Sequence, residues 1–241
     1  MKQLREEILA KTREYYRLTV KDKPFIPGET LINFGGALCD EREFSNMLDE
    51  SLVFWLSAGR YTDQFEKKLA ELIGAKKALA VNSGSSANLL AFSMLTSWKL
   101  GDRRVKKGDE VITVAAGFPT TVTPIIQYGA VPVFVDINLE TLNANVAQIK
   151  NAITPKTKAI ILAHTLGIPF NVRAIKELCE MHNLWLIEDN CDALGSMYEG
   201  KQTGSFGDLA TQSFYPPHHI TTGEGGAVLI NNMELYNIGL S

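Results

Sequence analysis

The stretch KALAVNSGSSANLLAFSMLTSW, residues 77–98, decides the fold of this 241-residue chain. Its apolar start, KALAVNS, predicts a strand, and the segment GSSANLLAFSMLTSW that follows predicts a helix. The same order recurs downstream, with strands expected at residues 110–116, 131–137, 159–165 and 184–190 and helices at 118–129, 145–153 and 171–182. Two more strands are expected at residues 210–215 and 226–231.

This repetition of strand and helix predicts an α/β fold. Runs of Val, Ile and Leu without polar alternation indicate strands that are buried on both faces. Such strands, joined by helices, form a mostly parallel central sheet with right-handed crossovers and flanking helices. Ligands of these sheets bind at the carboxyl ends of the strands, which is where the polar motifs of this chain fall.

The two ends of the chain suggest its domain organisation. Residues 1–60 are expected to form an N-terminal helical segment, with helices at Lys2–Leu18 and Arg42–Leu56. A helix at Asp63–Ile73 then begins a large domain that covers residues 61–241. The last residues, NNMELYNIGLS, start a helix-like pattern without a stop signal, so we expect a fragment whose C-terminal small domain is absent.

Composition argues against several classes of protein. The formal net charge is −3, and no basic reading helix is visible, which argues against nucleic-acid binding. No apolar run reaches the length of a membrane span, and the charged N-terminus lacks the apolar core of a signal peptide, so we expect a cytoplasmic protein. Cys39, Cys179 and Cys191 form no CxxC pair, which argues against a disulfide framework.

The first polar motif is VNSGSSANLL, residues 81–90. Gly84 permits a tight turn after a strand, and Ser85 and Ser86 open a helix. The free backbone N–H groups and the dipole of such a helix end form an anion site, to which the serine hydroxyls add donors. A plain serine-capped helix is the alternative interpretation.

The second motif is WLIEDNCDALGS, residues 185–196, in which Glu188 and Asp189 follow a buried strand. A carboxylate at a strand end can keep a pyridine nitrogen protonated, which makes the ring an electron sink. Asp189 is the expected ring partner, and Asp192 is placed to support a ring hydroxyl or a neighbouring group. The alternative is a strand that ends in solvated acids.

The third motif is SFYPPHHITTGEGGAV, residues 213–228. Ser213 ends a strand and is a candidate phosphate contact, while Pro216 and Pro217 are expected to direct an extended approach. The glycines of the motif permit tight or left-handed backbone. A loop with two surface histidines is the alternative. In a fourth segment, AAGFPTT, Phe118 is either a ring-stacking residue or a core residue at the start of a helix.

Taken together, these motifs resemble the DegT-like family of nucleotide-sugar aminotransferases and dehydratases. The resemblance runs from WLSAGRYTDQFEKKLAELIG (residues 55–74) to the SFYPPHHITTGEGGAV motif. It implies the large domain of the fold type I, aspartate aminotransferase-like transferases that depend on pyridoxal phosphate (PLP). In the family the last motif carries the lysine that forms a Schiff base with the cofactor. Here that position is His218, and no lysine follows Lys201.

A histidine cannot tether the cofactor but can move protons. The residue therefore favours chemistry on loosely held pyridoxamine 5′-phosphate (PMP) over transamination. The most similar subgroup is that of the RfbH-type CDP-4-keto-6-deoxyglucose 3-dehydratases, which serve 3,6-dideoxysugar synthesis for lipopolysaccharide. The resemblance implies that His218 is the base, that Asp189 pairs with the pyridinium nitrogen, and that Phe118 lies over the ring with Asp192 beside it. It further implies phosphate contacts from Gly84, Ser85 and Ser213.

The resemblance also implies further components. Dehydratases of this subgroup bind a [2Fe–2S] cluster whose first cysteine follows the acid pair, where Cys191 stands. The other three cysteines lie past residue 241 in the family, and Cys39 and Cys179 do not match them. A CDP-sugar substrate, a flavin/iron–sulfur reductase that uses NADH, and a homodimer are implied as well.

Several alternatives remain open. A GDP-4-keto-6-deoxymannose 3-dehydratase also uses histidine but needs no cluster. An ordinary sugar aminotransferase is disfavoured by the absent lysine, and a non-catalytic PMP-binding remnant is a different class. His219 competes with His218 as the base. We choose His218 because it aligns with the family lysine, and we expect His219 to have a core or loop-bracing role.

Overall fold

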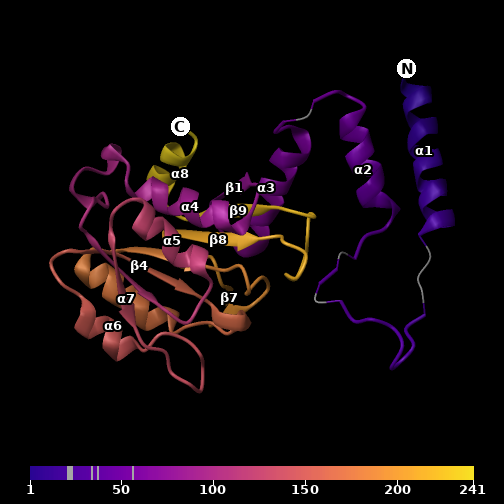
Figure 1. Cartoon of the computed structure of the whole chain (residues 1–241). Helices are drawn as coiled ribbons and strands as arrows, with labels where there is room; N and C mark the ends of the chain where they lie inside the picture. Colours follow the sequence, from indigo (N-terminus) through magenta and orange to yellow (C-terminus); the bar gives the residue numbers. More distant parts are fainter. Residues whose placement is uncertain (21–23, 34, 37, 56) are drawn as a thin grey trace. The chain divides into compact units, whose positions relative to one another are not determined.

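The computed structural model describes every residue except 21–23, 34, 37 and 56 (Figure 1). The chain divides into two compact units, Met1–Asp63 and Gln64–Ser241. Helix α3 (Arg60–Ile73) runs across the boundary between them.

The first unit contains α1 (Lys2–Thr19) and α2 (Glu41–Ser51), which contact one another. Asp40 caps α2 and forms a capping box with Glu43, a pairing that satisfies two backbone donors at the helix start. The helix predicted to reach Leu56 ends earlier, because Phe54 adopts a left-handed conformation with a φ of 56°. Residue 56 itself lies outside the described residues.

The second unit is built on a seven-stranded sheet with the strand order β1-β9-β8-β5-β4-β2-β3. Five of its strands, β8, β5, β4, β2 and β3, are parallel neighbours, and β9 runs antiparallel to both β1 and β8. The predicted mostly parallel sheet is therefore confirmed. The strands are β1 (Lys77–Val81), β2 (Glu110–Val114), β3 (Val131–Val135), β4 (Thr157–Ala163), β5 (Trp185–Asp189), β8 (Leu209–Ser213) and β9 (Gly226–Ile230).

Helices cover both faces of this sheet (Figure 1). One face packs against α4 (Gly84–Leu95), α5 (Pro119–Gln127) and α8 (Met233–Gly239). The other packs against α6 (Val146–Ala152), α7 (Val172–His182) and the second half of α3. The predicted helix 84–98 ends at Leu95, after which a 3₁₀ helix, η1 (Trp98–Arg103), leads toward β2. A second 3₁₀ turn, η2 (Thr165–Gly167), and a small hairpin of β6 (Met197–Tyr198) and β7 (Lys201–Gln202) were not predicted.

Successive side chains of β5 point to opposite faces of the sheet and pack in two different hydrophobic clusters. Trp185 and Ile187 belong to the cluster under α4, whereas Leu186 belongs to the cluster under α7. All five residues of β5 are buried, as are those of β8 and β9. The edge strand β3 is more exposed. The predicted burial on both faces therefore holds for the central strands and not for this edge.

Among the described residues, no helix is both long enough and apolar enough to cross a membrane.

Candidate functional site

A cavity of about 440 Å³ opens at the carboxyl ends of the parallel strands. Its walls come from the segments that follow β1, β2, β4, β5 and β8, so the chain returns to it five times. The eight residues to which the sequence assigned roles at the site all line this cavity: Gly84, Ser85, Phe118, Asp189, Cys191, Asp192, Ser213 and His218.

The start of α4 forms one wall. Ser83 is the N-cap, and its Oγ accepts a hydrogen bond of 3.1 Å from the backbone N–H of Ser86. The start of α4 is therefore a serine-capped helix end, and it faces the cavity where the sequence predicts an anion site. Ser85 Oγ bonds to Thr120 Oγ1 of α5 at 3.3 Å, which joins the starts of two helices at one side of the cavity. Both helix dipoles favour a negative group there.

Gly84 lies at the first helical position, where the helix approaches the end of β8. A Cβ on this residue would lie 2.5 Å from Cβ of Ser213 and 3.1 Å from Sγ of Cys191. Gly226 has a similar role, because a Cβ there would overlap the backbone of Ser83. Gly84 and Gly226 thus permit close approach of neighbouring backbone segments. Of the three glycines in residues 213–228, Gly223 alone adopts the left-handed backbone expected from the sequence, with a φ of 84°.

Asp189 ends β5 at the floor of the cavity and is 5% exposed. Its Oδ2 accepts hydrogen bonds from Thr121 Oγ1 at 2.6 Å and from Asn88 Nδ2 at 3.0 Å. Its Oδ1 accepts a longer bond of 3.3 Å from the backbone N–H of Cys191. The carboxylate is therefore fixed in orientation, and it is not the solvated strand end of the alternative interpretation.

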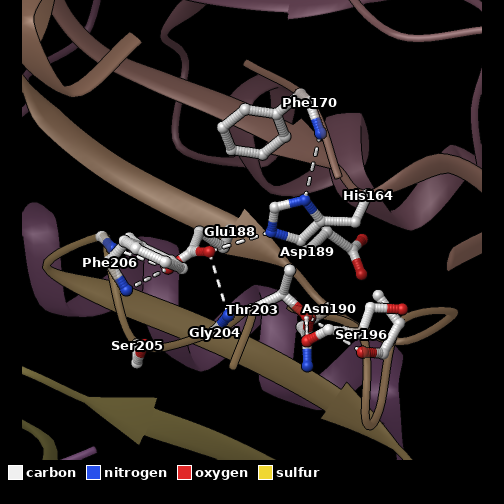
Figure 2. A network of polar contacts seen from close by, with 12 residues as sticks. His164, Phe170, Glu188, Asp189, Asn190, Ser196, Thr203, Gly204, Ser205 and Phe206 are labelled. Atoms are coloured by element: carbon white, nitrogen blue, oxygen red, sulfur yellow. Dashed lines mark hydrogen bonds and ion pairs between the residues drawn. The ribbon is translucent and has the colours of Figure 1, made fainter. Parts of the chain in front are cut away.

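The neighbouring acid, Glu188, points to the opposite face of the sheet and is fully buried (Figure 2). Its Oε2 accepts bonds of 2.9 Å from His164 Nε2 and from the backbone N–H of Gly204. Its Oε1 accepts the backbone N–H groups of Phe206 and Gly207 at 2.8 and 2.6 Å. Glu188 thus anchors the loop before β8, a structural role distinct from that of Asp189.

His164 is also fully buried and completes this anchor (Figure 2). Its ring stacks on Phe170 with centroids 4.3 Å apart and planes inclined by 5°. The backbone N–H of Phe170 donates to Nδ1 at 3.4 Å, which leaves Nε2 as the protonated nitrogen that donates to Glu188. The backbone N–H of His164 in turn donates to the carbonyl of Asp189 at 3.1 Å.

Phe118 is the N-cap residue of α5 and is 68% exposed at the cavity. The core interpretation of this residue is therefore wrong. A phenyl ring open to a cavity offers a face on which a flat ring can stack.

His218 lines the cavity from a turn. Its backbone N–H donates to the carbonyl of Tyr215 at 3.0 Å, so Pro216 and Pro217 are the centre of a turn and not the extended approach expected from the sequence. Nδ1 of His218 lies 3.3 Å from Oδ1 of Asp192. The next residue, His219, is exposed and does not line the cavity, which excludes the expected core role for it.

Cys191 presents its thiol to Gly84 at the cavity floor. Burial, and secondly the charge of Asp189, raise the pKa of this thiol well above its ordinary value. Within the part of the chain that the structure describes, no group of three or more His, Cys, Asp or Glu side chains could hold a metal ion. The described residues therefore contain no complete ligand set for the [2Fe–2S] cluster that the resemblance implies.

Sequence reasoning missed the partners of Asp189. Asn88 lies one helical turn after Gly84, as a polar residue between apolar neighbours, and Thr121 lies three residues after Phe118. A buried polar residue in an apolar helix face is a signal that could have identified Asn88. His164 carried no such signal, because its partner is 24 residues away.

The mostly parallel sheet with flanking helices is the fold of PLP-dependent enzymes of fold type I, to which the solved structures that this chain resembles belong. The E. coli GDP-4-keto-6-deoxy-D-mannose-3-dehydratase with bound hydrated PLP superposes with a TM-score of 0.81 at 36% identity, over 88% of this chain and 54% of that chain. The model of the DegT/DnrJ/EryC1/StrS aminotransferase family matches residues 38–239, and the chain belongs to this family.

Two curated relatives are more similar in sequence. The lipopolysaccharide biosynthesis protein RfbH of Salmonella typhimurium is 52% identical over 98% of this chain and 54% of its own length. The dTDP-4-dehydro-2,6-dideoxy-D-glucose 3-dehydratase of Saccharopolyspora spinosa is 52% identical over 97% of this chain and 50% of its own length. The chain thus spans about half the length of the curated relatives that it matches.

Proposed function

We propose that this chain forms the cofactor-binding part of a PMP-dependent nucleotide-sugar 3-dehydratase of dideoxysugar biosynthesis, acting on CDP-4-keto-6-deoxyglucose. The observation that carries the proposal is the presence of His218 in a cavity whose lining, all of it among the described residues, contains no lysine. The 3-dehydratase relatives support the reaction class. The position of Cys191 after the acid pair supports the choice of the CDP-sugar.

The residues present fit the cofactor. The starts of α4 and α5, with Gly84, Ser85 and Ser213, suit a phosphate. The exposed ring of Phe118 suits the face of a pyridine ring, and the buried carboxylate of Asp189 suits its nitrogen. The volume of the cavity falls within the range of about 300–1,000 Å³ that small-molecule sites occupy.

When bound, PMP would supply an amine for the sugar ketone and a ring that accepts electrons. Asp189 would keep that ring electron-poor by holding its carboxylate toward the nitrogen. Oδ1 of Asp192 would accept a hydrogen bond from Nδ1–H of His218, which keeps the proton on Nδ1 and leaves Nε2 unprotonated. Nε2 would then remove a proton from the carbon that bears the amine, and the carboxylate of Asp192 would stabilise the imidazolium that forms on His218.

The electron-transfer part of the proposal concerns the whole protein. A [2Fe–2S] cluster and a reductase that uses NADH would supply the two electrons needed to reach the 3-deoxy sugar. Within the second unit, Cys179 is a buried residue of α7 that packs in the core and does not line the cavity, whereas Cys191 does. No residue role here depends on the cluster.

A mass-spectrometric assay tests the proposed function. The protein is loaded with PMP and given the CDP-, GDP- and dTDP-linked 4-keto-6-deoxy sugars separately, with reductase and NADH. We expect loss of the C3 oxygen from the CDP-sugar, and no loss with the variant His218→Asn, which should still bind PMP. Loss only from the GDP-sugar without reductase would support the GDP-specific alternative. An aminated sugar formed with glutamate would contradict the dehydratase assignment.

A further inference from the structure

We infer that Thr121, Asn88 and Thr211 form a positioning device that aims the carboxylate of Asp189 at the cavity. The inference rests on the proposed function, because it assigns the device to the ring nitrogen of the bound cofactor. Its basis is the set of hydrogen bonds within the cavity floor.

The bonds are distributed unevenly over the two oxygens of Asp189. Oδ2 accepts both side-chain bonds, from Thr121 Oγ1 at 2.6 Å and from Asn88 Nδ2 at 3.0 Å. Oδ1 accepts the backbone N–H of Cys191 at the longer distance of 3.3 Å. The thiol of Cys191 also hydrogen-bonds to this carboxylate. A carboxylate oxygen has about two acceptor positions, so the two side-chain donors fill Oδ2, and Oδ1, with its longer backbone bond, is the oxygen left to face a ligand.

Thr211 controls the orientation of the Asn88 amide. Its Oγ1 donates to Asn88 Oδ1 at 2.7 Å. With the amide oxygen held in this way, the amide nitrogen must point toward Asp189. Thr211 of β8 therefore orients Asn88 of α4, which donates to Asp189 at the end of β5. Thr121 of α5 is the second donor to the same carboxylate.

Burial makes this arrangement consequential. Thr211 is fully buried, and Asn88, Thr121 and Asp189 are each 5% exposed. Water cannot readily replace a donor that is removed, and a buried polar group left without a partner is costly. The three side chains come from three elements of the rigid core, so they fix the rotation of the carboxylate about its Cβ–Cγ bond before any ligand arrives.

The variant Thr121→Val removes one donor while it keeps the shape of the side chain. We expect the dissociation constant for PMP, measured by fluorescence titration of the 241-residue chain, to rise about tenfold, as loss of a hydrogen bond to a charged group implies. We also expect the ¹⁵N resonance of the labelled ring nitrogen to move from the protonated toward the unprotonated position. Thr121→Ser keeps the hydroxyl and should restore both readouts.

Thr113 provides a matched control, because it is a fully buried threonine on β2 whose Oγ1 has no hydrogen-bond partner. Thr113→Val should leave both readouts at the wild-type value. If Thr121→Val binds PMP like the wild type and leaves the nitrogen resonance unchanged, the positioning inference is wrong and the proposed function stands. If the wild type does not bind PMP at all, the proposed function fails and takes the inference with it.

Discussion

The contact between Gly84 and Ser213 gives the most quantitative prediction. In the variant Gly84→Ala, the new methyl carbon would lie 2.5 Å from Cβ and 3.0 Å from Oγ of Ser213. Carbon atoms in contact prefer separations of about 3.5–4.0 Å, so α4 must retreat by about 1 Å. Overpacking of this kind costs about 1–3 kcal/mol, which exceeds the gain of at most about 1 kcal/mol from replacing a helical glycine.

The neighbours of Gly84 cannot easily yield. Ser213 lies on β8, which is paired on both sides by β5 and β9, and Sγ of Cys191 is the other close atom, at 3.1 Å. The start of α4 must therefore move, and with it the backbone N–H groups assigned to the anion. We expect a net loss of about 1–2 kcal/mol in the free energy of unfolding and a weaker affinity for PMP.

Urea unfolding at equilibrium measures the first effect, and fluorescence titration with PMP measures the second. Gly117→Ala is the matched control, because Gly117 lines the same cavity but a Cβ there would meet no atom within 4 Å. Gly226→Ala should be more damaging than Gly84→Ala, since its Cβ would overlap the backbone of Ser83. Equal stabilities for the variants at Gly84 and Gly117 would refute the packing argument.

Three further predictions concern single side chains. His218→Asn should slow the exchange of the C4′ protons of PMP in the presence of the keto sugar, followed by NMR, at least about a hundredfold. Asp192→Asn should slow this exchange less. Unchanged exchange in the His218 variant would exclude His218 as the base. Glu188→Gln should lower the free energy of unfolding, measured in urea, by about 3 kcal/mol or more, because the buried side chain that holds the loop loses its charge. Glu234→Gln, at an exposed acid, is the control. A loss at Glu188 no larger than the loss at Glu234 would contradict the anchoring role. Burial raises the pKa of the Cys179 thiol from 9.0 to about 12, so this thiol stays protonated to higher pH in the folded state than in the unfolded state. The contribution of Cys179 to the free energy of unfolding is therefore fully present below pH 9 and is lost between pH 9 and about 12. Cys179→Ala should flatten this alkaline decline in unfolding experiments, and an identical decline in both proteins would contradict the assignment.

The fold could be predicted largely because most strands of the sheet are continuous apolar runs. KALAVNS, EVITVAA and AIILAHT contain their strands almost entirely, and the helices between them follow a regular pattern. The predicted helix boundaries are wrong where the backbone conformation of a single residue sets the end of an element. At Phe54, a positive φ ends a helix that the hydrophobic pattern predicted to continue. The turn at Pro216 and Pro217 was missed for the same reason, since a pair of prolines fixes φ but not the direction of the chain.

The candidate site could be predicted in part. Residues at the end of a strand, such as Asp189 and Ser213, can be identified from the sequence, because the end of an apolar run is visible there. Their partners are not, because Asn88 and Thr121 reach Asp189 across 101 and 68 residues. The assignment of the two acids was also incomplete, since the sequence shows adjacent carboxylates but not that one of them serves a loop on the other face.

That adjacency has a consequence for mutagenesis. Glu188 and Asp189 are consecutive, yet one carboxylate fixes the loop at 204–207 and the other faces the cavity. Replacement of either would yield an inactive protein, and an activity screen would score the two changes alike. A comparison of unfolding free energies would separate them, because the Glu188 variant would release the loop at 204–207, whereas the Asp189 variant would keep that loop in place and lose the carboxylate in the cavity.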